Sequence, residues 1–339
     1  MVRRTVISLL IWMALSVPAA GQSSGGGFHK KATRTLKTVD NYLIHQQTRQ
    51  TTDTSYIWRP QEKWLFRTRS DVSRAFLFSR GLDQIDGVAA HLASEPRFKQ
   101  NIGIGYRGFV IGIGGNPFQK SSDKEFAFRV YKNRFGVDLS YGILGSLQGD
   151  MSLYGMDFAV EKNSFRAHCV NLSGYYAFNW RRFSMPAAMN QSYIQRRSAG
   201  SPLATAAFRF IGTGFYRSRQ KDYTVFNTRS VFFGVGGGYG YNWVPSEHWL
   251  LHLSVTETLG LAGPTWVYYL DSRTRCRSRF PSLLTTGNIA VIYYYKRLYA
   301  GAYCVVDNIF FPLKDTGSGN RFNIGLTRIQ GHFTIGFRI

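Results

Sequence analysis

Strict alternation of apolar residues with small or polar residues is the feature that most constrains the fold of this chain. Residues 101–106 read Asn-Ile-Gly-Ile-Gly-Tyr, and residues 231–243 and 289–295 repeat the pattern with Val, Ile, Phe, Tyr and Trp. A period of two with aromatic and β-branched residues is typical of β-strands. No segment after residue 21 shows a helical period. The sequence therefore predicts an all-β antiparallel fold, either an exported sandwich or a transmembrane barrel.

Strand length and aromatic placement favour the barrel. Several alternating runs exceed the roughly five or six residues typical of soluble sheets and match the roughly nine to eleven that a tilted membrane-spanning strand needs. Tyr and Trp cluster near strand ends, at 241–249 and 266–269, where an interfacial aromatic girdle would lie. We therefore expect an antiparallel transmembrane β-barrel over residues 61–339 with about 12 strands, 10 or 14 being the neighbouring counts.

The connections predicted from turn residues are of two kinds. Short hairpins are expected at 133–134, 179–182, 296–297 and 330–331. Longer polar stretches, among them 144–164 and 262–286, are expected to be loops. Tight turns at one end and long loops at the other are typical of outer-membrane barrels.

The N-terminus predicts export. Arg3 and Arg4 precede an apolar run at 6–17, and small residues at Ala19 and Gly21 fit a cleavage site before Gln22. Residues 1–21 thus read as a signal peptide, because the apolar run is too short to span a bilayer. Residues 22–60 are polar and lack periodicity, which predicts a flexible leader.

The charge of the chain points to anionic partners. Its 42 Lys and Arg against 19 Asp and Glu give a formal net charge of +23. Export argues against nucleic acid and favours the phosphates of lipopolysaccharide, which arginine binds as a planar fork. One candidate basic loop alternates along an extended segment. It consists of Arg273, Arg275, Arg277 and Arg279.

No cofactor or metal is expected. Cys169, Cys276 and Cys304 lack zinc-ligand spacing, and whether any of them pair is not readable from the sequence. His248 and His252 would lie too far apart on a strand to share one ion, at about 13 Å.

One segment resembles a known family. Residues 182–201 read Arg-Phe-Ser-Met-Pro-Ala-Ala-Met-Asn-Gln-Ser-Tyr-Ile-Gln-Arg-Arg-Ser-Ala-Gly-Ser, which is similar to the central motif of a Bacteroidetes family, domain of unknown function 4421. Residues 53–57, Asp-Thr-Ser-Tyr-Ile, resemble the start of that family after its signal peptide. The resemblance covers roughly 53–339 and implies an exported outer-membrane β-barrel. It implies no catalytic residue.

The same motif is the candidate binding patch, because it places amides, hydroxyls and two guanidinium groups close together. The alternative is a polar barrel interior whose side chains satisfy one another. The patch consists of Asn190, Gln191, Ser192, Gln195, Arg196, Arg197 and Ser198.

The function expected from these features is that of an outer-membrane pore or binding barrel for anionic solutes or lipid headgroups. A structural or assembly partner in a cell-envelope complex is the first alternative, and a lipid-modifying or proteolytic outer-membrane enzyme is the second. Enzymatic activity is not expected, since no spacing among Ser192, Asp157, His168, His248 and His252 selects a catalytic set. The C-terminal stripe at 333–339 predicts recognition by the barrel-assembly machinery.

Overall fold

The computed structural model describes residues 51–62, 64–81, 89–106, 109–115, 124–153, 156–216, 224–269, 272–278, 281–315 and 321–339. The expected signal peptide at 1–21 and leader residues 22–50 lie outside these ranges. Residues from Thr52 to Ile339 form one compact unit.

Within this unit, fifteen strands form one sheet, and β1 and β9 form a separate two-stranded sheet. Every strand pair is antiparallel, as the sequence predicts. The strands are β1 (Ile57–Trp58), β2 (Trp64–Gly81), β3 (Ala89–Ala93), β4 (Arg97–Tyr106), β5 (Phe109–Gly115), β6 (Lys124–Tyr131), β7 (Phe135–Leu153), β8 (Met156–Ala177), β9 (Ile194–Gln195), β10 (Ala199–Tyr216), β11 (Thr224–Ser246), β12 (Trp249–Ala262), β13 (Pro264–Tyr269), β14 (Ser272–Ser278), β15 (Ser282–Tyr295), β16 (Leu298–Asp315) and β17 (Arg321–Arg338), and the helix is α3 (Met185–Met189).

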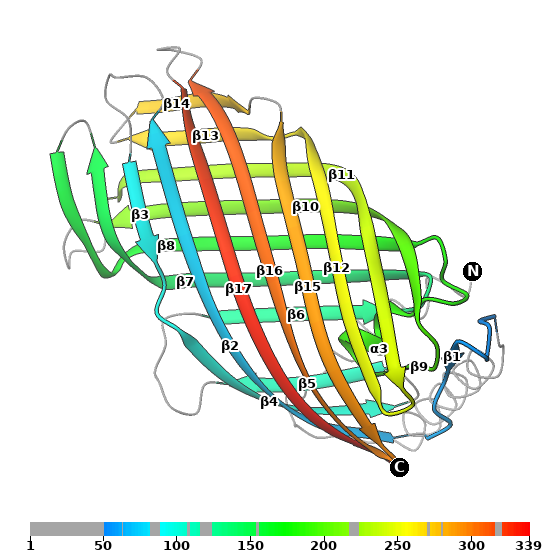
Figure 1. Ribbon diagram of the computed structural model, residues 1–339. Coiled ribbons are helices and arrows are strands. Elements are labelled where there is room, and N and C mark those ends of the chain that lie inside the picture. The colour runs from blue at the N-terminus through cyan, green and yellow to red at the C-terminus, as the bar shows by residue number, and fades with distance from the viewer. Residues whose placement is uncertain are drawn as a thin grey trace, which may run out of the picture. The chain divides into compact units, whose positions relative to one another are not determined.

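The large sheet closes on itself as a barrel (Figure 1). Pairing runs through β2, β17, β16, β15, β12, β11, β10, β8, β7 and β3 and returns to β2. The last strand therefore pairs with the first strand of the barrel, with Phe337 opposite Phe66. Closure gives each strand of this ring a hydrogen-bonded neighbour on both sides, so that the ring has no open edge.

The strand number differs between the two ends of the barrel. At the end with the short turns, β4–β5 and β6 enter the wall beside β2 and β7, so that the wall comprises β2, β4, β5, β6, β7, β8, β10, β11, β12, β15, β16 and β17. These are twelve strands, the predicted count. At the other end β13 and β14 lie between β11 and β16, and β3 joins β2 to β7.

The change of neighbour from β4 to β3 has a local cause. Both strands pair with β2 and are separated only by residues 94–96, which include Pro96. Proline cannot donate to a ladder and is confined to edges and bulges. The Ser94 hydroxyl accepts from the backbone N–H of Ala75 instead, at 2.8 Å.

The short turns lie where two of the predictions placed them and not at two others. The hairpins at 133–134 and 296–297 are confirmed. The hairpin at 330–331 is wrong, because β17 runs through it with Gln330 paired on both sides, to Ser73 and Val305. The turn at 179–182 instead opens a long segment between β8 and β10. The loops at 144–164 and 262–286 are also wrong, since strands β7, β8 and β13 to β15 occupy most of both ranges.

The outward face of the barrel is apolar. Apolar side chains that point outward on β12 and β15 are partly or largely exposed, and Leu253 and Ile289 are each 56% exposed. Aromatic residues gather on this face beside the short turns, as predicted for 241–249. They include Trp64, Phe178, Tyr241, Trp243, Trp249, Tyr293 and Tyr295.

The inward face is filled. At the end opposite the short turns, two apolar clusters occupy the interior, one around Leu77, Leu147 and Phe165 and the other around Phe232 and Ile309. Their side chains are buried inside the ring of strands. Among the residues that the structure describes, no helix is long and apolar enough to cross a membrane.

Candidate functional site in the barrel lumen

The family-like motif forms a plug inside the barrel. Residues 178–198, here called the plug segment, leave the wall after β8 and return to it at β10. Ser184 is the N-cap of helix α3, and its hydroxyl accepts a hydrogen bond from the Ala187 N–H. Pro186 lies in the first turn, where the helix needs no N–H donor. Ala187 and Ala188 pack against Leu250 and Ile292, which face the interior. The plug segment therefore fills the lumen at the end with the short turns.

Gln195 is the hydrogen-bond centre of the plug segment. Its carbonyl oxygen accepts from the Ser184 N–H at 3.0 Å and from Asn242 Nδ2 at 3.0 Å. Its amide nitrogen donates to the carbonyls of Arg182 and Arg197, at 2.6 and 2.9 Å. One buried side chain thus joins both ends of the plug segment to strand β11.

Three residues of the wall hold the backbone of the plug segment. Asn242 Nδ2 donates to the Ser184 carbonyl at 2.9 Å, and Tyr294 Oη donates to the Ala187 carbonyl at 3.2 Å. Arg338 Nη2 donates to the Gln191 carbonyl at 2.6 Å. These bonds satisfy carbonyls that the short helix leaves open.

The candidate patch divides into two groups. The amides and hydroxyls are used within the fold: Asn190 accepts from Ser192, Gln191 donates to the Ala188 carbonyl, and Ser198 accepts from the Val244 N–H. Together with Gln195 they form the satisfied polar interior that the sequence left open as an alternative. Arg196 and Arg197 are exposed instead. Binding by the patch stays a prediction, and these two guanidinium groups are its accessible members.

The end of the expected leader is folded onto the plug segment. Ile57, which is 1% exposed, pairs with Gln195, and Trp58 pairs with Ile194. The Asp53 N–H also donates to the Arg181 carbonyl at 2.9 Å. The expected end of the leader at residue 60 is therefore corrected. The folded unit begins at Thr52, because β1 pairs with β9.

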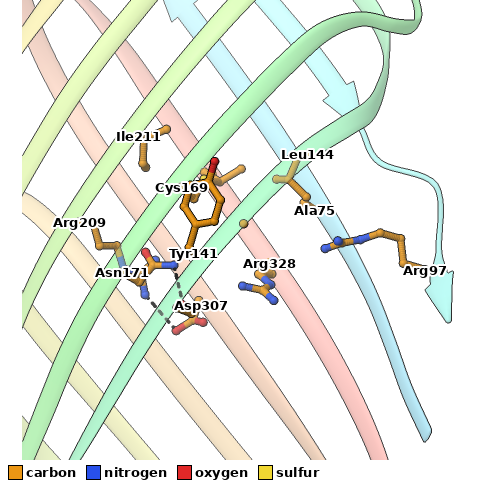
Figure 2. A pocket seen from close by; sticks show the side chains of 13 residues that line it. Ala75, Arg97, Tyr141, Leu144, Cys169, Asn171, Arg209, Ile211, Asp307 and Arg328 are labelled. Carbon is orange, nitrogen blue, oxygen red and sulfur yellow. Dashed lines mark hydrogen bonds and ion pairs between the residues drawn. The ribbon is translucent and has the colours of Figure 1, made fainter. Parts of the chain in front are cut away.

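A cavity lies beside the apolar clusters inside the ring of strands, lined by Ala75 and Leu144 of one cluster and by Ile211 of the other (Figure 2). It has about 40 Å³ of space for the centres of water molecules. Side chains from opposite walls line it, and they come from β2, β4, β16 and β17 on one side and from β7, β8 and β10 on the other. The polar ones are Arg97, Ser140, Asn171, Arg209, Asp307 and Arg328.

Three guanidinium groups reach this cavity, with one carboxylate among the lining side chains. Arg209 Nη2 lies 3.4 Å from Asp307 Oδ1, which also accepts from Thr286 Oγ1 at 2.8 Å. Arg328 lies opposite Asp307 in the register of the β16–β17 ladder. Arg97 is buried, with only 5% of its surface exposed. Figure 2 shows Arg97 and Arg328 approaching from the wall opposite Arg209. Three cationic side chains and one carboxylate are thus among the residues that line the cavity.

A second polar cluster lies closer to the plug segment. Asp71 forms an ion pair with Arg69 at 2.8 Å and a hydrogen bond with His332 Nδ1 at 2.6 Å, and Arg129 forms an ion pair with Asp138 at 2.6 Å. On the inward face, cationic side chains outnumber carboxylates. The cations are Arg67, Arg69, Arg97, Lys99, Arg129, Arg209, Arg328 and Arg338, and the carboxylates are Asp71, Asp138 and Asp307.

A buried Ser–His–Asn chain runs beneath the plug segment. Asn242 Nδ2 donates to two carbonyl oxygens, so its Oδ1 faces His252 Nδ1 at 2.7 Å. His252 Nε2 then accepts from Ser254 Oγ at 3.0 Å. Asn288 Nδ2 also donates to Ser254 Oγ, at 3.1 Å. Of the histidines singled out from the sequence, only His252 belongs to this set; His168 lies on β8 and His248 in the β11–β12 turn.

The candidate basic loop is a strand. Arg273, Arg275 and Arg277 lie on β14, in register with Tyr268, Trp266 and Pro264. Arg277 is also in register with Lys314 of β16. The extended segment expected from the alternation is thus present, while Arg279 lies outside the described residues.

Within the described ranges, no group of three or more His, Cys, Asp or Glu side chains is arranged to hold a metal ion.

The comparison with protein families agrees with the motif. The model of a domain of unknown function, DUF4421, matches residues 51–338. The chain belongs to this family. The DUF4421 region therefore includes β1, the plug segment and the whole barrel, and the motif from which the resemblance was inferred is the plug segment itself. No curated protein matches the chain.

Solved structures with a similar fold are all distant. The chain is 9% identical to the outer membrane protease OmpT from Escherichia coli, with a TM-score of 0.42, over 83% of this chain and 97% of that one. It is 11% identical to the outer membrane protein OprG from Pseudomonas aeruginosa, with a TM-score of 0.29 and coverage of 83% and 100%. For the translocator domain of the autotransporter NalP from Neisseria meningitidis the identity is 10%, the TM-score 0.28 and the coverage 92% and 96%.

Proposed function

We propose that this protein is an outer-membrane β-barrel that binds a small oxyanion, such as phosphate or a carboxylate, in its lumen. The observation that carries the proposal is the convergence of Arg97, Arg209 and Arg328 on one cavity with a single carboxylate, Asp307. The expected signal peptide at 1–21 would deliver the chain to the envelope.

The outward face supports a membrane location. A continuous apolar outer wall is not expected on a soluble barrel, because large exposed apolar patches are rare on soluble monomers. Here Leu253, Ile289 and Phe333 are each at least half exposed, on three different strands. The aromatic residues beside the short turns match the interfacial girdle of membrane barrels.

The charge balance of the cavity supports an anionic ligand. Guanidinium groups recognise carboxylate and phosphate oxygens as bidentate forks. Three arginines and one carboxylate, Asp307, are among the side chains that line the cavity. The volume of about 40 Å³ admits about three waters, or an anion of a few heavy atoms.

The filled interior favours a binding barrel over an open pore. The plug segment occupies one end of the lumen, and the two apolar clusters occupy the other. An ion path would need an aqueous channel past both.

The test is isothermal titration of the detergent-solubilised protein with inorganic phosphate. We expect saturable binding that weakens on the order of tenfold or more in Arg328→Gln, because a hydrogen bond to a charged group contributes about 1.5–3 kcal/mol. The matched control is Arg229→Gln, which removes an exposed arginine of β11 and should leave binding unchanged. Equal binding by both variants and the parent chain would refute a lumenal site.

A hydrolase is the second candidate, and one observation favours it. Ser254, His252 and Asn242 have the order of nucleophile, base and orienting group, and Asn288 could donate to an oxyanion. The plug segment covers this set, so activity would require the plug segment to move. Labelling of the parent chain, but not of Ser254→Ala, by a fluorophosphonate probe would support hydrolase activity. Phe183→Ala removes the ring beside His252 and should open access to Ser254. If this variant also forms no Ser254 adduct, hydrolase activity is excluded.

A further inference from the structure

The end of the barrel with the short turns carries arginines stacked on aromatic rings. Arg182 and Arg197 lie over Tyr56, at 5.1 and 5.9 Å from the ring centre, and Arg196 lies over Trp58 at 5.5 Å. We call this surface the arginine–aromatic face. Its other pairs are Arg59 over Tyr193, Arg134 over Tyr176 and Trp180, and Arg181 over Trp180.

Most guanidinium groups of this face are accessible to solvent. Arg134, Arg181, Arg182, Arg196 and Arg197 are exposed. An ion pair on this face joins Arg182 to Asp53 at 3.5 Å, between two partly exposed groups, so it contributes little to stability.

Stacking prepares these groups for a ligand. A cation–π contact restrains the guanidinium group beside the ring, and an exposed guanidinium group can still donate its N–H groups to a carboxylate. Less conformational freedom is then lost on binding. The positive potential also acts on a neighbouring amine: burial lowers the pKa of Lys132, and the charge of Arg59 lowers it further.

We propose that the arginine–aromatic face is a docking surface for an acidic polypeptide of the periplasm. Arginine and aromatic residues are the types most enriched at the energetic centres of protein interfaces, and the excess of positive charge requires an acidic partner. The docking surface is independent of oxyanion binding in the lumen.

The position of the face favours a polypeptide over a membrane. Arg182, Arg196 and Arg197 belong to the plug segment, which lies inside the ring of strands, and Tyr56 and Trp58 lie on the segment paired with it. Lipid headgroups surround the outer wall of a barrel rather than its mouth. A polypeptide that enters the mouth of the barrel can reach the plug segment. Binding there would contact the segment that closes the lumen.

The experiment is fluorescence anisotropy of labelled poly-L-glutamate with the full chain in detergent. We expect binding that weakens with salt and falls on the order of tenfold or more in the triple variant Arg182→Gln, Arg196→Gln, Arg197→Gln. The control triple variant, Arg80→Gln, Arg229→Gln, Lys314→Gln, removes the same charge from exposed positions of β2, β11 and β16 and should bind almost normally.

Two outcomes would overturn the proposal. Equal losses in the two triple variants would show that only net charge matters. Stronger binding to vesicles of phosphatidylglycerol than to poly-L-glutamate, lost in the same variant, would assign the face to a membrane. Phosphate titration of the triple variants keeps the two claims apart, because lumenal binding should persist when this face is neutralised.

Discussion

At the scale of single residues, the plug segment depends on side chains whose hydrogen-bonding groups are fully used. Gln195 makes four hydrogen bonds, two of them to groups on the far side of the plug segment. A buried amide with four partners is stabilising, but removal of such a group leaves every partner unsatisfied. The motif is thus specific in sequence because its residues must fit one another.

Substitution of Gln195 by alanine should destabilise the protein. The Ser184 N–H, Asn242 Nδ2 and two carbonyls lose their partner, and each unsatisfied buried group costs about 1–3 kcal/mol before water enters. We expect a clear fall in the thermal midpoint, followed by the heat-induced gel shift. Gln148→Ala, at an exposed glutamine of β7, is the control and should change the midpoint little. Equal midpoints for both variants would contradict the role given to Gln195.

These residue-level contacts could not be predicted from the sequence. The motif at 182–201 shows amides and arginines close together, which suits a binding patch and a satisfied interior equally well. The partners that decide between them, Asn242, Tyr294 and Arg338, lie tens of residues away on other strands. The cavity likewise joins β4, β10 and β17, whose order around the barrel follows only from the pairing.

At the scale of elements, the short strand β1 is bound to the plug segment through a two-stranded sheet of its own with β9. It pairs with β9 over two residues, and Asp53 anchors the turn before it. The hydrogen bond from the Ser55 hydroxyl is the largest of the effects that lower the pKa of Asp53, and the Arg182 charge adds to it. The attachment is therefore strongest while Asp53 is ionised.

The docking of β1 should weaken in acid. A lowered pKa means that the contribution of Asp53 is fully present above its unfolded value of about 3.9 and is lost as the pH falls through the lower folded value. The protection of the Ile57 amide against hydrogen exchange, measured relative to its intrinsic rate at each pH, should fall below about pH 4 in the parent chain. In Asp53→Asn the same exchange should show a smaller dependence over this range. Identical pH profiles would show that the carboxylate does not hold the turn.

The strands themselves followed closely from the alternation of the sequence. Inward and outward positions of β12, β15 and β17 agree with the period of two, because each outward residue meets a uniform apolar surrounding. The predicted loop at 144–164 failed because β7 and β8 continue beyond the apolar wall. There the buried apolar residues include Leu147 and Met151, and register shifts between Leu144 and Gly149 interrupt the period of two. The false hairpin at 330–331 arose from a Gln-Gly pair that here lies in mid-strand.

At the scale of the whole molecule, the barrel has an apolar outside and a cationic inside that is filled at both ends. This arrangement predicts how the protein responds to charge on its outer wall. Leu253 is 56% exposed on β12, so Leu253→Arg would be nearly neutral in water. In a bilayer the same change costs about 2–4 kcal/mol near the midplane.

We therefore expect Leu253→Arg to reduce the yield and stability of the folded barrel in lipid vesicles, measured by the heat-shifted gel band. Lys314→Arg, an exposed change on β16 that preserves charge, is the control. Normal folding of Leu253→Arg in vesicles, together with recovery of the parent chain from the soluble fraction, would reject the membrane location.

The filled lumen predicts an electrically silent barrel. The purified parent chain, inserted into planar bilayers, should show no steady current, because the plug segment and the apolar clusters leave no continuous aqueous path. A steady anion-selective current would instead assign the protein to the open pores.

Diffraction can show directly whether an oxyanion binds among the three lumenal arginines. Crystals soaked in selenate, a tetrahedral oxyanion with a strong anomalous signal, locate the bound ion without assumption about its position. We expect one peak in the cavity, within hydrogen-bond distance of Arg97, Arg209 or Arg328. Selenate bound only on the outer surface, with the lumenal cavity holding water alone, would contradict it.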